Sequence, residues 1–366
     1  MKATTAFIER TGGPEVIEWR EHQLPAPGPG EVTIEQTAVG LNFIDTYHRR
    51  GIYPIDLPGR LGLEAAGRIV ALGEGVTGFT EGDRVATFGP ARGAYASARN
   101  VAAASLFKLP PGIDDRTAAA ALLKACTVEF LVERCARVEA GWPVLVHAAA
   151  GGVGLLLVQW LKHVGATVIG TVSTAAKAEA AREAGADEVI LYTVDPVASR
   201  VRELTNGKGV RVTFDGVGMA TWDAPLDSTG RRGLEVNYGN ADAPVGAVNL
   251  GILALKGSLY NTRRSPRAST GCARKCRRGA AWRQKPTASP PFNSRIARAS
   301  CGLATSRPSP SIIWRTLVTC AALLGASSPR PSHSESSSPT RTCPPMLAAM
   351  AATFICACPA ASTDQR

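Results

Sequence analysis

Residues 142–192 read WPVLVHAAAGGVGLLLVQWLKHVGATVIGTVSTAAKAEAAREAGADEVILY. The run 144–146 is short and apolar, as expected for a strand buried on both faces. A turn of small residues follows, and the apolar segment 155–164 is long enough for a helix. Gly165 breaks that helix before a second apolar run, 167–171. The stretch therefore predicts a βαβ unit.

The turn inside this unit has the spacing Ala149-x-Gly151-x-x-Gly154, a dinucleotide fingerprint with alanine in the first glycine place. Such a turn needs a tight bend, close backbone approach to a pyrophosphate and close packing of helix on strand. The helix is expected to start near Gly152, so that Gly152 and Val153 lie at its N-terminus. It directs its N–H groups and the positive end of its dipole toward phosphates. An ordinary glycine-rich turn is the alternative, but the flanking strand and helix favour a nucleotide site.

The end of the second strand bears on the choice between NADH and NADPH. Enzymes that prefer NADH carry Asp or Glu about 20 residues after the glycines, where it accepts from the ribose 2′-OH. Residues 171–177 contain no carboxylate, whereas Ser173 is a donor for a phosphate oxygen and Lys177 adds positive charge. Alternatively, Ser173 or Thr174 is only a helix N-cap and Lys177 is solvated. Both roles can coexist, and the pattern favours NADPH.

Charge is distributed unevenly along the 366 residues, a length sufficient for two domains. The formal net charge of +11 arises after Thr262, where basic residues are frequent and the acids are Glu335 and Asp364. All but Cys126 and Cys135 of the nine cysteines also follow Thr262, without paired CxxC spacing. Neither a disulfide framework nor a metal site is predicted. The near-neutral first part is typical of a soluble enzyme.

The N-terminal sequence has no apolar core of the signal-peptide type. The longest apolar runs, around 317–326 and 346–358, are shorter than the roughly 20 residues that a membrane span needs. The sequence therefore predicts a cytoplasmic protein without membrane attachment.

Two structured domains and a tail are expected. Residues 1–125 predict a β-rich barrel or sandwich, because short alternating runs such as 31–39, 85–88 and 94–96 are separated by turns. The alanine-rich segment 115–137 predicts a linking helix.

Residues 126–263 continue in βαβ rhythm. The pattern predicts helices at 174–184 and 197–205, and strands at 188–191, 210–215, 233–239 and from 257 onward. The carboxyl ends of such strands line the ligand crevice. We therefore expect the crevice to include Gly216, Gly218, Tyr238, Gly239 and Asn240.

Several longer motifs carry a family resemblance. They include GLNFIDTYHRRGIYP at 40–54, LGLEAAG at 61–67, HAAAGGVG at 147–154 and RRGLEVNYGN at 231–240. Over residues 1–263 the chain resembles the zinc-free, zeta-crystallin-like quinone oxidoreductases of the medium-chain dehydrogenase/reductase superfamily. The resemblance implies an α/β fold with a GroES-like β-barrel catalytic domain and a doubly wound Rossmann domain. It also implies NADPH as cofactor, a quinone or enone substrate and a homodimer.

The resemblance further implies which residues form the site. Zinc-dependent relatives carry Cys at the place of Asn42 and His at the place of Leu63, so zinc catalysis is not expected. Asn42, Asp45 and Tyr53 are expected beside the nicotinamide and the substrate, with Asn42 and Tyr53 donating to a quinone oxygen and Asp45 orienting them. Alternatively, Tyr53 is a lid aromatic and Asp45 caps a turn.

Three further residues are assigned to the cofactor through the resemblance. Lys124 and Thr127 are expected near its ribose and nicotinamide, although Lys124 is equally compatible with a surface helix position. Tyr192 is expected to stack near the adenine phosphate, with a packing role as the alternative. His147, next to the phosphate turn, is expected to position backbone.

The resemblance fails after Arg263. Residues 264–366 are rich in Ser, Pro, Arg, Ala and Cys and have no sustained apolar period, which is typical of disorder. The abrupt change indicates a shifted reading frame; the alternative is a genuine basic tail that binds nucleic acid non-specifically. In either case the catalytic domain lacks its usual C-terminal part. A catalytically impaired nucleotide-binding remnant is therefore the alternative to an active reductase of quinones or other α,β-unsaturated carbonyls.

Overall fold

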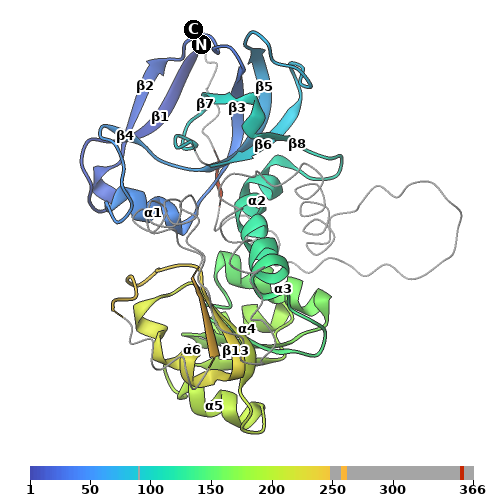
Figure 1. The fold of residues 1–366 in the computed structure, drawn as a ribbon. Helices are drawn as coiled ribbons and strands as arrows, with labels where there is room; N and C mark the ends of the chain where they lie inside the picture. Colours follow the sequence, from blue (N-terminus) through green and yellow to red (C-terminus); the bar gives the residue numbers. More distant parts are fainter. Residues whose placement is uncertain (90, 248–256, 262–354, 358–366) are drawn as a thin grey trace, which may run out of the picture.

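The computed structural model describes residues 1–89, 91–247, 257–261 and 355–357 and consists of two lobes joined by helix α2 (Asp115–Glu129) (Figure 1). In the N-terminal lobe one sheet has the order β2-β1-β4 and the other the order β15-β3-β5-β6-β8, with β7 beside β3. The elements of this lobe are β1 (Lys2–Ile8), η1 (Pro14–Val16), β2 (Glu18–Gln23), β3 (Glu31–Gly40), α1 (Phe43–Arg49), β4 (Gly59–Arg60), β5 (Glu64–Leu72), β6 (Arg84–Phe88), β7 (Ala98–Ala102), η2 (Ala103–Ser105) and β8 (Leu106–Lys108).

Strand β15 (Ile355–Ala357) comes from the far C-terminal part of the chain. It pairs antiparallel with β3, placing Ile355 opposite Gly40. The remainder of segment 264–366 lies outside the described residues. The predictions of disorder and of a shifted reading frame concern this segment and therefore stay predictions.

The second lobe is a parallel sheet with the order β11-β10-β9-β12-β13-β14. Its elements are η3 (Phe130–Ala136), β9 (Pro143–Val146), α3 (Gly152–Val164), β10 (Thr167–Val172), α4 (Ala175–Glu183), β11 (Glu188–Leu191), α5 (Val197–Leu204), β12 (Val210–Asp215), η4 (Met219–Thr221), α6 (Asp223–Ser228), β13 (Thr229–Asn237) and β14 (Gly257–Asn261). Chain order reverses between β9 and β12, where doubly wound sheets bind their ligands. The predicted Rossmann architecture is confirmed.

The apolar strand β9 is buried on both faces. Val144 and Val146 pack into one core with α2, α3 and α4, whereas Leu145 packs into a second core with α5. This two-sided burial explains why its sequence is continuously apolar rather than alternating.

Helix α2 belongs to both lobes. Ala118, Ala119 and Leu122 pack in the core of the β-rich lobe, and Ala125 and Val128 pack in the Rossmann core. The division into domains 1–125 and 126–263 stays a prediction, and it cuts this shared helix.

Four details differ from the sequence expectation. Strand β13 begins at Thr229 rather than 233, because the chain continues pairing through a register shift at which Arg232 has a left-handed φ of 62°. The expected helix 115–137 becomes a π-helix from Phe130, a widening that helix propensity does not encode. Segment 94–96 forms an isolated bridge, Thr5 with Ala96, instead of a strand. Helix α6 was not expected, since Pro225 lies inside it.

Strand β13 also buries a carboxyl group. Glu235 is 1% exposed, and neither of its carboxylate oxygens has a hydrogen-bond partner within the described part of the chain. Burial, and secondarily the charge of Asp215, raises the pKa of Glu235 well above its usual value. The group is thus held in an environment that disfavours its charge.

Replacing Glu235 with leucine is expected to raise the free energy of unfolding by about 1–3 kcal/mol, because it removes an unpaired buried polar group. The same substitution at the exposed Glu35 of β3 is the control and is expected to leave stability nearly unchanged. Urea unfolding monitored by circular dichroism measures both. A loss of stability in Glu235→Leu would show that the carboxyl group has a stabilising partner.

Candidate active site

The predicted phosphate turn joins β9 to α3. Ala148 has a left-handed φ of 51°, its carbonyl accepts from Gly151 N at 2.8 Å, and Gly151 is the N-cap of α3. A Cβ atom added at Gly154 would lie 2.2 Å from Ala148 O and 2.8 Å from Ala149 O, both backbone atoms. Glycine is therefore required at 154 by close packing of the helix on the turn, which is the fingerprint's physical demand.

The other members of the fingerprint have unequal access to a ligand. Ala149 is fully buried, and its N–H donates to Thr171 O at 3.1 Å, so that only its backbone shapes the site. Gly152 and Val153 form the first turn of α3, where N–H groups have no partner in the helix.

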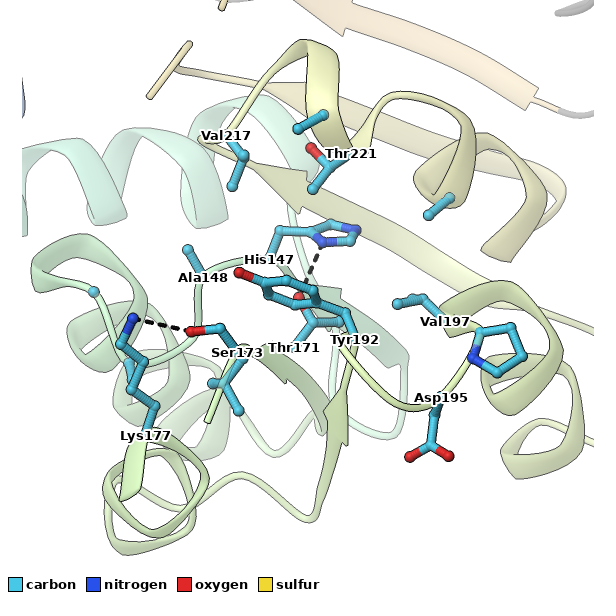
Figure 2. Close-up of a pocket in the computed structure, with 16 residues that line it drawn as sticks. His147, Ala148, Thr171, Ser173, Lys177, Tyr192, Asp195, Val197, Val217 and Thr221 are labelled. Carbon is cyan, nitrogen blue, oxygen red and sulfur yellow. Dashed lines mark hydrogen bonds between the residues drawn. The ribbon is translucent and has the colours of Figure 1, made fainter. Parts of the chain in front are cut away.

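A cavity of about 410 Å³ opens beyond the carboxyl ends of β9, β10 and β11. Figure 2 shows Ser173 and Lys177 together at one end of it and Asp195 at the other. Lys177 Nζ donates to Ser173 Oγ at 3.1 Å. Thr174 caps α4 by accepting from Lys177 N at 3.3 Å. The capping and phosphate-binding interpretations are thus compatible, because Thr174 caps the helix while Ser173 and Lys177 face the cavity.

His147 and Tyr192 also line this cavity (Figure 2). His147 is buried. Thr171 Oγ1 lies 3.0 Å from Nδ1 of its ring, and the backbone N–H of His147 donates to Phe214 O at 3.0 Å. Burial lowers the pKa of His147, which favours the neutral ring. Tyr192 is 51% exposed, so its ring is accessible to a ligand.

The loop after β12 is held by Asp215, which is fully buried. Its carboxylate accepts from Val217 N at 2.7 Å and from Thr221 Oγ1 at 2.9 Å, and Gly218 has φ 99°. A Cβ at Gly216 would lie 2.8 Å from the ring of Tyr238. This loop and the loop after β13 therefore pack closely at the crevice.

The two lobes meet at the same loops. Asn240 N donates to Tyr47 Oη at 3.0 Å, which links the end of β13 to helix α1. A Cβ at Gly239 would lie 2.5 Å from Gly216 O. Burial raises the pKa of Tyr238, and Asp215 and Tyr47 add to the shift. The loops after β12 and β13 are thus brought together next to the N-terminal lobe, with Gly216, Gly218, Tyr238, Gly239 and Asn240.

The expected substrate residues cluster around α1. Asn42 is its N-cap, and Asn42 N donates to Asp45 Oδ2 at 3.0 Å; this oxygen also accepts from Tyr95 Oη at 2.7 Å. Tyr53 packs beside Tyr47, with ring centroids 5.0 Å apart. The carboxylate of Asp45 thus accepts from the backbone N–H of Asn42 and closes the first turn of α1, as in the capping alternative.

The side chain of Asn42 has two acceptors within the protein. Its Nδ2 donates to Glu64 Oε2 at 2.8 Å and to Gly40 O at 3.3 Å, so both amide hydrogens are directed at protein acceptors. In this arrangement Asn42 donates to the protein and not to a quinone oxygen.

Lys124 and Thr127 lie on α2. Lys124 is 5% exposed, which rules out the surface position, and its Nζ donates to Glu64 Oε2 at 3.3 Å. Thr127 Oγ1 donates to Leu123 O at 2.9 Å, a bond within its own helix. Lys124 thus lies with Asn42, whereas the contacts of Thr127 give no direct sign of a ligand role.

Sequence reasoning overlooked Glu64, Tyr95, Tyr47 and Asp215. Glu64 occurs in the sequence motifs only as part of LGLEAAG at 61–67. A carboxylate within an apolar strand, as in LGLEAAG, is the one local signal that could have marked it.

Asp45 gives the site a predicted pH dependence. Burial raises the pKa of Asp45 to about 6, against the lowering effect of the Tyr95 hydrogen bond. The folded chain therefore retains a proton that the unfolded chain has lost, and stability falls as pH rises from about 4 to about 6. The loss should reach about 3 kcal/mol if Asp45 acts alone.

Asp45→Asn removes this titration. We expect melting temperatures measured across this pH range to fall less steeply in the variant than in the unmodified protein. Parallel slopes would show that Asp45 titrates as it does in the unfolded chain.

Among the residues that the structure describes, no three His, Cys, Asp or Glu side chains are grouped to hold a metal ion. Within the same residues, no helix combines the length and the apolar character needed to cross a membrane.

The sequence is similar to known protein families and to characterised relatives. Residues 28–111 match the family described as "Alcohol dehydrogenase GroES-like domain", and residues 152–272 match "Zinc-binding dehydrogenase". The chain is 51% identical to a quinone oxidoreductase of Pseudomonas aeruginosa over 69% of its own length and 78% of that protein. The chain belongs to the quinone oxidoreductase family. This assignment confirms the resemblance within the medium-chain dehydrogenase/reductase superfamily.

Other quinone oxidoreductases agree with this assignment. Quinone oxidoreductase 1 of Escherichia coli is 47% identical over 72% of this chain and 81% of its own length. The crystal structure of Escherichia coli quinone oxidoreductase complexed with NADPH is similar with a TM-score of 0.69 and 37% identity, covering 89% of this chain and 97% of that one. The quinone oxidoreductase structure from Pseudomonas syringae has the same TM-score at 47% identity, covering 74% of this chain and 83% of that one.

Proposed function

We propose that this chain is an NADPH-dependent quinone reductase that works by hydride transfer without zinc. The observation that carries the proposal is the pairing of Ser173 and Lys177 at the end of β10, in a cavity next to the phosphate turn. A hydroxyl and an ammonium group suit a 2′-phosphate, and residues 171–177 contain no carboxylate that would repel it. The NADPH complex of the Escherichia coli relative adds support.

The residues present fit a dinucleotide along the whole crevice. Gly151, Gly152 and the N-terminus of α3 would hold the pyrophosphate, and Tyr192 would lie near the adenine side. The loops at Gly216–Gly218 and Tyr238–Asn240 would border the nicotinamide side, where Tyr47 links them to the catalytic lobe.

Bound NADPH supplies a hydride, which together with one proton from solvent converts a quinone into its hydroquinone. The protein contributes by positioning the nicotinamide and the quinone against each other and by excluding water. Tyr53 keeps its proposed role as donor to a quinone oxygen. Asn42 and Asp45 are proposed to shape the floor of the cleft through the hydrogen bonds that hold the start of α1.

Turnover by the purified full-length protein tests this proposal. We expect quinone-dependent loss of NADPH absorbance, weaker activity with NADH, and a reduced rate in Tyr53→Phe. Phe7→Tyr, which adds a hydroxyl on the distant strand β1, is the control for a non-specific change. Absence of quinone-dependent oxidation with either nucleotide would leave the catalytically impaired nucleotide-binding remnant as the better account.

Zinc independence rests on the chemistry of the side chains. Leu63 has no ligand atom, and the amide of Asn42 is directed at Glu64 and Gly40. Dialysis against a strong chelator is therefore expected to leave turnover unchanged, and added zinc to give no stimulation. A zinc-dependent alcohol dehydrogenase treated in parallel should lose activity. Loss of turnover that zinc restores would contradict this part of the proposal.

Other α,β-unsaturated carbonyls are the second candidate substrates. This alternative is favoured by a 2-haloacrylate reductase of Burkholderia that is 43% identical over 70% of this chain and 80% of its own length. Comparing kcat/KM for a simple quinone and for 2-chloroacrylate distinguishes the two.

We further propose a homodimer in the cytoplasm, which light scattering and cell fractionation test. Non-specific nucleic-acid binding through the basic tail stays the alternative for segment 264–366, which lies outside the described residues except 355–357.

A further inference from the structure

We propose that Glu64 is a positioning residue of the reductase site, whose charge holds the Lys124 ammonium group against the Asn42 amide. This inference rests on the proposed function, because it assigns a partner to residues expected at the nicotinamide and the substrate. It adds a carboxylate to a site for which sequence reasoning had offered Asp45 alone.

Among the described residues of the N-terminal lobe, Glu64 is the most completely buried charged one, at 0% exposed. Three donors from two other segments converge on it. Asn42 Nδ2 lies 2.8 Å and Lys124 Nζ lies 3.3 Å from Oε2, and Leu123 N lies 2.6 Å from Oε1. A buried carboxylate persists only when its charge is paired and its oxygens accept hydrogen bonds, and both conditions are met here.

These bonds tie together the elements that border the cleft. Asn42 precedes α1, and Tyr53 follows the end of that helix. Leu123 and Lys124 lie on α2, the helix shared by both lobes. The space is tight, since a Cβ at Gly40 would lie 2.8 Å from Glu64 Cδ. Glu64 therefore fixes the position of α2 relative to the start of α1, and with it the position of the Lys124 cation.

A Glu64→Gln substitution separates the charge from the shape. The glutamine oxygen can accept from Asn42 or from Leu123 N but not from both, because the amide NH2 replaces one of the two accepting oxygens. The charge that attracts Lys124 is lost. We expect kcat/KM for a quinone to fall about tenfold or more, as is typical of hydrogen bonds between charged groups. The NADPH dissociation constant, measured by nicotinamide fluorescence, is expected to change less than about threefold, because the phosphate cavity is in the other lobe.

A double-mutant cycle with Lys124→Met gives the decisive readout. If Glu64 acts through Lys124, Glu64→Gln has little further effect on turnover once Lys124 is gone. The double variant leaves no unpaired charge, so it remains informative even if Glu64→Gln alone does not fold. Glu129→Gln is the matched control. Glu129 is the last residue of α2, and its substitution removes the ion-pair partner of Arg134. We expect this variant to turn over like the unmodified protein.

The outcomes are distinguishable. Failure of the unmodified protein to bind NADPH would refute the proposed function, and the role of Glu64 in the reductase site with it. Normal turnover by Glu64→Gln, or equal losses from this substitution with and without Lys124, would overturn the inference. A melting temperature lowered without any change in kcat/KM of the folded protein would also overturn it and leave Glu64 a structural residue.

Discussion

Replacing Gly154 with alanine is expected to weaken NADPH binding by about 100-fold or more. The added Cβ would lie 2.2 Å from Ala148 O, and the two other nearest atoms are also backbone. Neither side can yield without moving α3 away from the phosphate turn, and a displacement of about 1 Å is enough to cost a factor of this size in a positioned site. Titration of nicotinamide fluorescence measures the effect.

Two further glycines make this a graded experiment. At Gly151 the nearest atom to an added Cβ is Ala148 O at 3.1 Å, so Gly151→Ala should have an intermediate effect. At Gly246 nothing lies within 4 Å, and Gly246→Ala should bind NADPH normally. Circular dichroism of each variant separates loss of binding from loss of folding. Normal binding by Gly154→Ala would contradict the close packing of this turn.

Replacing Lys177 with alanine is expected to raise the NADPH dissociation constant about 10- to 100-fold and to leave that for NADH unchanged. The reason is the loss of a charged hydrogen-bond donor, worth about 1.5–3 kcal/mol, from the Ser173 end of the cavity. Because the side chain is exposed and the substitution is near a helix terminus, protein stability should change little.

Lys208→Ala is the control for removing one positive charge from the same lobe, since Lys208 is exposed and does not line the cavity. Its affinity for both nucleotides should match that of the unmodified protein. An equal loss for NADPH and NADH in Lys177→Ala would show that Lys177 contacts a part that the two nucleotides share. The 2′-phosphate assignment would then be wrong.

The Rossmann lobe was predictable because its signals are local. The apolar run of β9, the small residues up to Gly154 and the break at Gly165 are consecutive in sequence, and each reports on its own backbone. Gly165 does end α3 in the left-handed conformation, with φ 89°. The loops at 216–218 and 238–240 also lie together, since the ends of parallel strands meet at one edge of the sheet. Their place at a ligand crevice stays a prediction.

The parts that escaped prediction depend on distant contacts. Glu64 is recognisable as a site residue only once Asn42 and Lys124 are seen to meet it, about 20 and 60 positions away along the chain. The hydrogen bonds from Asn42 to Glu64 and to Gly40 O were not predictable for the same reason. The early start of β13 was hidden by Arg231 and Arg232, two exposed charges that local patterns assign to a loop.

Titration of the purified full-length protein with NADPH and with NADH, followed by nicotinamide fluorescence, tests the central claim most directly. The account predicts saturable binding of NADPH at least about tenfold tighter than that of NADH, as the additional charged contact requires. Equal affinities, or tighter binding of NADH, would contradict the assignment of Ser173 and Lys177 to the 2′-phosphate and the NADPH dependence built on it.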